Sequence, residues 1–139
     1  MIELKNYLRT SFDKAVLFDT DVVIDFLKGD KRSTTFFDTY VFSGLLTPTI
    51  SSFTAAELFS VARDKREEQN LDLWLSSAFD ILEMDYQTLK EAGILKKTHK
   101  MQMSNAIIAA VATKERIPLL TSNSEQYRKL NMRIFKPYV

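Results

Sequence analysis

The segment AVLFDTDVVIDFLKGD, residues 15–30, contains the pattern that decides the fold. Its first four residues are apolar and end at an acid, which predicts a short buried strand. Residues 22–27 are again mostly apolar and are followed by the turn formers Gly29 and Asp30, which predicts a short helix that ends there. The segment therefore predicts a strand that leads directly into a helix.

The same alternation continues along the chain. Further strands are predicted at 48–52, 79–82 and 117–121, with an edge strand at 133–135. Helices are predicted at 31–43, from residue 54 to about residue 70, and at 71–77, 86–97, 104–114 and 124–130. Thr54 and Ser104 are the predicted N-caps of the helices that begin there. Strands that alternate with helices indicate a parallel sheet covered on both faces. We therefore predict an α/β protein with a three-layer α/β/α, Rossmann-like fold and a central parallel sheet of four or five strands.

The length and composition fit one domain. With 139 residues, 45% of them hydrophobic, the chain can bury one core of ordinary size. We expect residues 15–139 to form this domain, after an N-terminal extension, residues 1–14, that is a helix or a partner contact. No apolar run approaches the roughly 20 residues that span a bilayer, and the first residues lack the apolar core of a signal peptide. We therefore expect a cytoplasmic protein with no membrane contact.

The composition also excludes several classes of site. The chain has no cysteine and one histidine, which excludes disulfides, thiolate zinc sites, cysteine nucleophiles and metal sites built on two histidines. A net charge of +1 leaves no overall attraction for nucleic acid, so such a contact must come from local patches. The basic stretch 96–100, together with Lys28, Lys31 and Arg32, is one candidate for guiding phosphates, although a solvated surface explains any single lysine equally well.

Polar side chains follow the predicted strands where these end. Ligands of open α/β sheets bind outside the carboxyl ends of the strands, so residues from four segments should meet at one edge. These residues are Asp19, Thr20 and Asp21; Ser51, Ser52 and Glu57; Asn105; and Thr121, Ser122 and Asn123. Mg²⁺ and Mn²⁺ prefer oxygen ligands, and such an ion polarises a phosphodiester and activates water. The interpretation requires that the side chains of residues 19, 57 and 105 share one face of the molecule.

Three segments resemble the motifs of the PIN-domain family, which includes the VapC-type toxins. They are residues 16–30, residues 50–62 (ISSFTAAELFSVA) and residues 104–127 (SNAIIAAVATKERIPLLTSNSEQY), and they occur in the order and spacing of that family. Each segment alone is a weak signal, but the ordered set is specific and covers the chain from about residue 15 to its end.

The resemblance implies roles for six residues. Asp19 and Glu57 match metal-binding carboxylates of the family. Asn105 lies where the third acid is normally an aspartate, and Asn123 where a fourth acid or an asparagine is found. The hydroxyl positions near the metal are matched by Thr20 and Thr121. We therefore expect four catalytic residues, Asp19, Glu57, Asn105 and Asn123, of which the first three are also metal ligands.

The function implied by the resemblance is that of a Mg²⁺- or Mn²⁺-dependent endoribonuclease, the toxin of a toxin–antitoxin pair. It would hydrolyse RNA phosphodiester bonds with a metal-activated water. The partners implied are an RNA substrate, a small antitoxin protein and a second copy of the chain in a homodimer.

Asn105 departs from the family pattern, because an amide oxygen can contact a metal but carries no charge. The loss of one carboxylate from so small a cluster should weaken metal binding and catalysis. Two explanations remain open. An aspartate was replaced to silence a toxic nuclease, or the protein is a naturally degenerate PIN module that binds RNA or a protein partner without cleavage.

Structural roles compete with the functional ones at several positions. An aspartate or threonine after a strand, such as Asp19 or Thr20, is often the N-cap of the next helix. Glu57 completes the form of a capping box with Thr54, and Asn123 is a common turn former.

Two other enzyme classes share part of the first motif. The sequence LFDTDVV resembles the first motif of haloacid-dehalogenase-like phosphatases, but Thr-Ser-Asn-Ser follows the strand at 117–121, where that class needs a pair of acids. A response-regulator receiver needs a phosphoacceptor aspartate after its third strand and a lysine after its fifth, and no matching lysine is found. Both interpretations are therefore poor.

Overall fold

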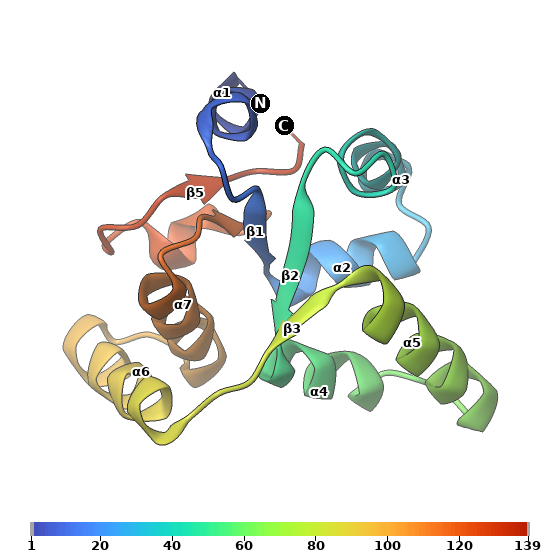
Figure 1. Cartoon of the computed structure of the whole chain (residues 1–139). Helices are drawn as coiled ribbons and strands as arrows, with labels where there is room; N and C mark the ends of the chain where they lie inside the picture. The colour runs from blue at the N-terminus through green and yellow to red at the C-terminus, as the bar shows by residue number, and fades with distance from the viewer. Residues whose placement is uncertain (1, 139) are drawn as a thin grey trace.

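The computed structural model describes residues 2–138, so Met1 and Val139, at the outer limits of the expected extension and domain, lie outside the described residues. Five parallel strands form one sheet in the order β3-β2-β1-β4-β5 (Figure 1). The strands are β1 Ala15–Phe18, β2 Thr47–Ser51, β3 Asp80–Leu82, β4 Leu119–Leu120 and β5 Ile134–Phe135. The prediction of a parallel sheet with four or five strands is confirmed.

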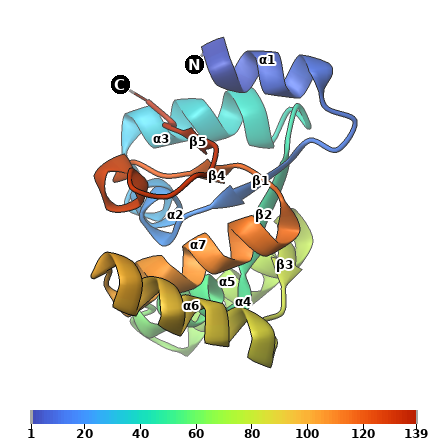
Figure 2. The same cartoon turned by 90° about the vertical axis from the view of Figure 1, so that its left-hand side faces the viewer.

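Helices cover both faces of this sheet. One buried cluster contains side chains of α1 Ile2–Thr10, α2 Thr20–Leu27, α3 Lys31–Phe36, α4 Ser52–Ser60 and α5 Lys65–Ala78. A second cluster, on the other face, contains side chains of α6 Tyr86–His99 and α7 Met103–Glu115. Figure 2 shows α6 and α7 lying side by side, nearer the viewer than α4 and α5. The three-layer α/β/α arrangement is therefore the one expected from the sequence.

Strand β1 lies at the centre of the sheet and is buried on both faces. Val16 and Phe18 point into the first cluster and Leu17 into the second, and all three are fully buried. A central parallel strand has no solvated face, which explains why its sequence is a continuous apolar run. The ring of Phe18 makes edge-to-face contacts with Phe37 and Phe79 and thereby joins β1 to the helical layer.

The helices after β2 differ from the prediction. Strand β2 ends at Ser51, whose hydroxyl accepts a hydrogen bond from the Thr54 N–H at 3.0 Å, so Ser51 is the N-cap and Thr54 lies inside α4. The predicted helix to about residue 70 is wrong, because α4 ends at Ser60 and Asp64 caps a new helix, α5, with its carboxylate. This helix runs on to Ala78, so the predicted boundary at residues 70 and 71 does not exist.

Three further predicted helices have different ends or geometry. The segment predicted as a helix at 31–43 is α-helical to Phe36 and then continues as a π-helical turn, Phe37–Val41. Helix α7 begins at Met103, with Gln102 as its N-cap, so Ser104 lies in the first turn and is not the cap. The segment predicted as a helix at 124–130 contains only a 3₁₀ turn, η2, at Ser124–Tyr127.

The N-terminal segment contains α1, which packs on the rest of the fold. Leu4 and Leu8 are buried in the first core cluster, and α1 lies close to the last described residues (Figures 1 and 2). No helix in the described part of the chain is long and apolar enough to cross a membrane.

A candidate active site at the carboxyl ends of the strands

Asp19 follows the last residue of β1 and is bound by three donors. Its Oδ1 accepts the Thr20 N–H at 2.8 Å, which makes Asp19 the N-cap of α2. Its Oδ2 accepts the hydroxyls of Thr121 at 2.9 Å and Tyr127 at 2.8 Å. The register explains the Thr121 contact, because Phe18 pairs with Leu120 and the next residues of the two strands are therefore neighbours. Asp19 is thus both a cap and the centre of a polar cluster.

The Asp19 carboxylate is 8% exposed. Burial raises its pKa above the ordinary value, and the nearby negative charge of Glu57 acts in the same direction. The hydrogen bonds from Tyr127 and Thr121 oppose this increase in pKa because they stabilise the ionised form.

Glu57 reaches the same cluster from α4. Its Oε1 accepts the Thr20 hydroxyl at 2.5 Å, and the same Thr20 oxygen lies 3.0 Å from the Thr54 hydroxyl. Thr54 therefore contacts α2 instead of capping its own helix, which rules out the capping box. Thr20 links the two carboxylates, because its backbone N–H binds Asp19 and its hydroxyl binds Glu57.

Asn105, in the first turn of α7, contacts the other side of the cluster. Its Oδ1 lies 3.2 Å from the Tyr127 hydroxyl, and its Nδ2 lies 3.2 Å from Gln126 Oε1. One chain of hydrogen bonds therefore runs from Glu57 through Thr20, Asp19 and Tyr127 to Asn105. The structure places residues 19, 57 and 105 in a single polar cluster, as the sequence interpretation requires.

Thr121 and Asn123 lie in the segment that follows β4. The Thr121 side chain is fully buried, and besides binding Asp19 it accepts the Asn123 N–H at 3.0 Å. The Asn123 side chain is exposed and makes no hydrogen bond with the described residues. Of the expected catalytic residues, Asn123 is thus the one whose side chain stays outside the cluster.

Asp21 also lies at this edge, and only one of its two carboxylate oxygens is hydrogen-bonded within the described residues. Its Oδ2 accepts the Ser122 hydroxyl at 2.6 Å, whereas its buried Oδ1 has no hydrogen-bond partner among the described residues. Burial, and next the charge of Asp19, raise the pKa of Asp21 to about 6.

Sequence reasoning missed Tyr127 and Gln126 as site residues, and it named Asp21 without a role. Asp21 had a detectable signal, because it stands three residues after the end of β1. Tyr127 had a weaker one: it is the last residue of the segment 104–127 that resembles the family, but it lies in a 3₁₀ turn and the resemblance gave it no role.

The oxygens of this edge match a divalent metal in type but only partly in arrangement. Within the described residues, no group of three or more His, Cys, Asp or Glu side chains is placed to hold a metal ion. A carboxylate can accept about four hydrogen bonds, two at each oxygen. Asp19 accepts two hydrogen bonds at Oδ2 and one at Oδ1. An acceptor position on Asp19 Oδ1 and the second oxygen of Glu57 remain for an ion that keeps most of its water, which fits Mg²⁺ or Mn²⁺.

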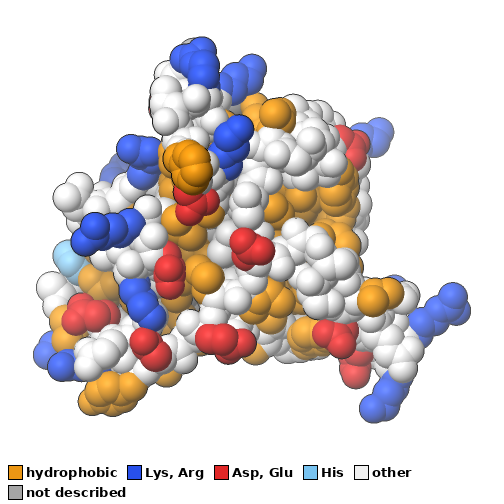
Figure 3. Space-filling model, in the orientation of Figure 1, with side chains coloured by type: hydrophobic (Ala, Val, Ile, Leu, Met, Phe, Trp, Pro, Cys, Tyr) orange, Lys and Arg blue, Asp and Glu red, His pale blue; other side chains and the backbone are white. Residues whose placement is uncertain are grey.

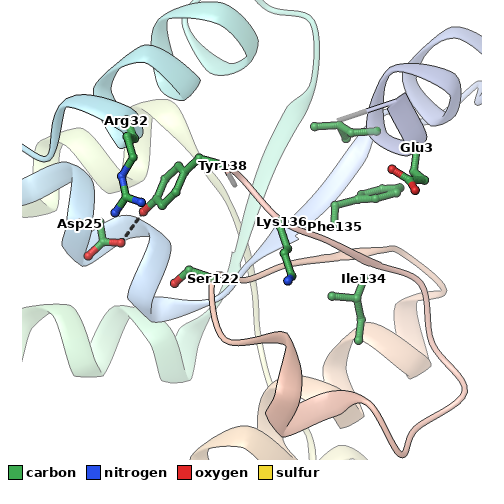
Figure 4. Close-up of a pocket in the computed structure, with 9 residues that line it drawn as sticks. Glu3, Asp25, Arg32, Ser122, Ile134, Phe135, Lys136 and Tyr138 are labelled. Carbon is green, nitrogen blue, oxygen red and sulfur yellow. Dashed lines mark hydrogen bonds between the residues drawn. The ribbon is translucent and has the colours of Figure 1, made fainter.

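Two hollows that contain basic side chains lie beside the cluster. One, about 600 Å³, is lined by Arg32, Lys136, Tyr138 and Ser122, the partner of Asp21 (Figure 4). Within it, the guanidinium of Arg32 lies 4.4 Å from the centre of the Tyr138 ring, and the Tyr138 hydroxyl donates to Asp25.

The second hollow is smaller, about 140 Å³, and adjoins the cluster at Gln126. Lys100 and Lys129 line it together with His99 and with Gln126, the partner of Asn105. In Figure 3, acidic side chains lie across the middle of the visible face, and most of its basic side chains lie toward the margin.

The parallel sheet and its acidic edge define a small α/β protein with an oxygen-rich candidate site at the strand ends. The PIN domain family model matches residues 16–130, so this chain belongs to the PIN domain family. No curated protein matches the chain by sequence.

Several solved structures have a similar fold. A toxin–antitoxin complex from Klebsiella pneumoniae matches with 25% identity and a TM-score of 0.74, over 88% of this chain and 98% of that chain. VapBC-1 from nontypeable Haemophilus influenzae matches with 20% identity and a TM-score of 0.73, over 88% and 98%. VapBC2 from Rickettsia felis, bound to a DNA fragment from its promoter, matches with 21% identity and a TM-score of 0.69, over 88% and 98%.

Proposed function

We propose that this chain is the toxin of a toxin–antitoxin pair and acts in the cytoplasm as a Mg²⁺- or Mn²⁺-dependent endoribonuclease. The observation that carries the proposal is the hydrogen-bonded cluster that joins Asp19, Glu57 and Asn105 at the carboxyl ends of the strands. Membership of the PIN domain family and the likeness to toxin–antitoxin complexes support it.

Asp19 and Glu57 are the residues that would hold the ion, through the oxygens that accept fewest hydrogen bonds. When bound, a divalent ion lowers the pKa of a water and offsets charge on the phosphodiester. Thr20 orients both carboxylates, since it donates to each of them. Thr121 fixes the rotation of the Asp19 side chain from the neighbouring strand, and Asn105 offers an amide to the same space without adding charge.

Basic side chains beside the cluster are available to the phosphates of an RNA substrate, although Glu3, Asp25 and Glu125 line the same hollows. Arg32 and Lys136 lie on the side of Ser122, and Lys100 and Lys129 lie on the side of Gln126. A strand of RNA that crosses the cluster would place phosphates near both groups, so that local charge compensates for a net charge of only +1.

A specific observation also favours the second candidate function, a PIN module that binds without cleavage. Asp19 Oδ2 already accepts two hydroxyls, and Asn105 contributes no charge where the resemblance expects an aspartate. Both features reduce the attraction of the cluster for a cation.

Membership of the PIN domain family and the likeness to a toxin–antitoxin complex also support an antitoxin protein as a partner. An apolar groove offers a surface to which it would bind. The groove, about 680 Å³, lies between α2, α4 and α5 and is lined by Leu27, Val61 and Trp74. Leu27 is 46% and Val61 57% exposed, so Leu27→Asp and Val61→Asp should weaken antitoxin binding without unfolding the chain. A homodimer stays a prediction of the resemblance.

The experiment that tests the enzymatic proposal compares RNA cleavage in Mn²⁺ by four proteins: wild type, Asp19→Asn, Asn105→Asp and Asn131→Asp. The last is a matched control, because Asn131 is exposed and lies outside the cluster. We expect Asn105→Asp to raise the rate at least about ten-fold and Asp19→Asn to lower it about 100-fold, by analogy with other charge-stabilising groups.

Growth of a bacterial host tests the toxin role. Expression of the wild type, or more strongly of Asn105→Asp, should slow growth, and Asp19→Asn should relieve this effect. If neither wild type nor Asn105→Asp cleaves RNA, while both bind it, the chain is the non-cleaving module.

A further inference from the structure

Tyr127 occupies the centre of the cluster although no motif assigns it a role. Its side chain is fully buried, and its hydroxyl oxygen lies 2.8 Å from Asp19 Oδ2 and 3.2 Å from Asn105 Oδ1. A tyrosine phenol has an ordinary pKa of about 10 and is protonated at neutral pH. The phenol therefore keeps its proton and acts as a hydrogen-bond donor.

A phenol has only one hydrogen to donate. The ionised carboxylate of Asp19 is the nearer and stronger acceptor, so the hydrogen belongs to that contact. The phenol oxygen can then accept from residue 105. An amide side chain can turn by 180° and present its NH₂ group to this oxygen, while Gln126 turns likewise and donates to the amide oxygen.

An aspartate at position 105 could not complete this arrangement. It has no hydrogen to give when ionised, so two carboxylates would compete for the one phenol hydrogen. Asn105 and Tyr127 thus match each other chemically, and Gln126 extends the match. The hydrogen-bonding groups of Asn105, Tyr127 and Gln126 are complementary only when residue 105 is an asparagine. This favours a natural asparagine over an aspartate that was replaced.

A buried carboxylate needs a partner, because an unpaired buried charge is costly. In an acidic cluster a bound cation supplies that partner. Here the Thr20 backbone N–H and the hydroxyls of Thr121 and Tyr127 donate to Asp19. Of these donors, Tyr127 is the one that also contacts residue 105.

We propose that Tyr127, matched by Asn105, is a built-in partner for Asp19 that takes the place of a cation at Oδ2. Asp19 Oδ2 is then satisfied without metal, and Tyr127 is a positioning residue that limits how tightly a divalent ion binds. The proposal rests on the proposed function only in assigning the ion to Asp19 and Glu57.

The test measures Mn²⁺ affinity by calorimetric titration and the melting temperature with and without Mn²⁺. The proteins are wild type, Tyr127→Phe, Asn105→Asp and Tyr138→Phe. Phenylalanine keeps the shape of the ring and removes only the hydroxyl. Tyr138→Phe is the matched control, because it removes another tyrosine hydroxyl that donates to an aspartate, Asp25, outside the cluster.

Tyr127→Phe should bind Mn²⁺ at least about ten-fold more tightly, since a hydrogen bond to a charged group is typically equivalent to a factor of ten or more. Its melting temperature should fall without metal and recover with Mn²⁺. Asn105→Asp, which keeps the tyrosine, should show the same two changes if the phenylalanine variant does not fold. Tyr138→Phe should leave Mn²⁺ affinity unchanged.

The proposal is overturned if Tyr127→Phe folds and binds Mn²⁺ no more tightly than wild type, whatever Asn105→Asp does, because an added carboxylate attracts a cation by its own charge. If Tyr127→Phe does not fold, an Asn105→Asp variant that binds Mn²⁺ no more tightly than wild type overturns the proposal. A lower melting temperature without a gain in affinity would show that Tyr127 is merely structural. Tighter Mn²⁺ binding by Tyr127→Phe with no RNA cleavage by any variant would support this proposal and refute the nuclease. If the wild type cleaves RNA and the variants bind Mn²⁺ with the same affinity as the wild type, the nuclease is supported and this proposal is refuted.

Discussion

The Thr20 hydroxyl lies 2.5 Å from Glu57 Oε1 and so ties the helix after β1 to the helix after β2. The two residues are 37 positions apart in the chain. The contact holds Glu57 on the same side as Asp19, to which the Thr20 N–H is bound.

Thr20→Val keeps the shape of the side chain but removes this hydroxyl. It should lower the free energy of unfolding by about 1–3 kcal/mol, because the half-buried carboxylate of Glu57 loses a charge-assisted hydrogen bond. Urea denaturation measures the change. Thr10→Val is the control, since the Thr10 hydroxyl binds a backbone carbonyl on the exposed surface of α1, and its effect should be near zero. Equal stability of Thr20→Val and wild type would contradict the proposed importance of the contact.

Asp21 should make the stability depend on pH. Its pKa is raised from 3.8 to about 6, so the folded state favours the protonated form, and ionised Asp21 lowers stability as the pH rises through 6. Asp21→Asn cannot ionise and should be more stable than wild type above that pH, by on the order of 2 kcal/mol. The gain should shrink as the pH falls toward 3.8. Urea denaturation across this range tests it, and a gain independent of pH would refute the assignment to ionisation.

Phe18 should be among the residues on which the fold depends most. Its side chain is 0% exposed, at the centre of the aromatic cluster, whereas Phe12 is fully exposed. Phe18→Ala should cost about 3–5 kcal/mol of unfolding free energy because it leaves a cavity. Phe12→Ala is the matched control and should change the melting temperature little. A loss of similar size for both would contradict the described packing.

Arg32 and Lys136 should contact RNA phosphates if a strand crosses the cluster. In an Asp19→Asn background that prevents cleavage, Arg32→Gln and Lys136→Gln should each weaken binding of a short RNA and lower the slope of log affinity against log salt by about 0.7. Fluorescence anisotropy at several salt concentrations measures both effects. Arg66→Gln, on the exposed surface of α5, should leave affinity and slope unchanged. An unaltered slope in the pocket variants would place the RNA elsewhere.

Local sequence was enough to predict the sheet and part of the site. The apolar run of β1, the short strand pattern of β2 and the polar residues that follow each of them depend only on neighbouring residues. The helix boundaries were less predictable, because Ser51 and Thr54 are both acceptable caps and only the end of β2 selects Ser51. Likewise Asp64 caps a new helix in a charged stretch that has the composition of one continuous helix.

The sequence by itself determined that this is a parallel α/β protein with Asp19 and Glu57 at its strand ends, since burial periodicity and strand-end position are local properties. Only the tertiary structure decided which donors surround Asp19. Tyr127 is 108 residues away from it, and the two meet because β4 lies beside β1 and the 3₁₀ turn after β4 folds back over the sheet edge. Neither strand order nor the path of such a turn is encoded in local periodicity, so the partner that completes this centre becomes visible only in three dimensions.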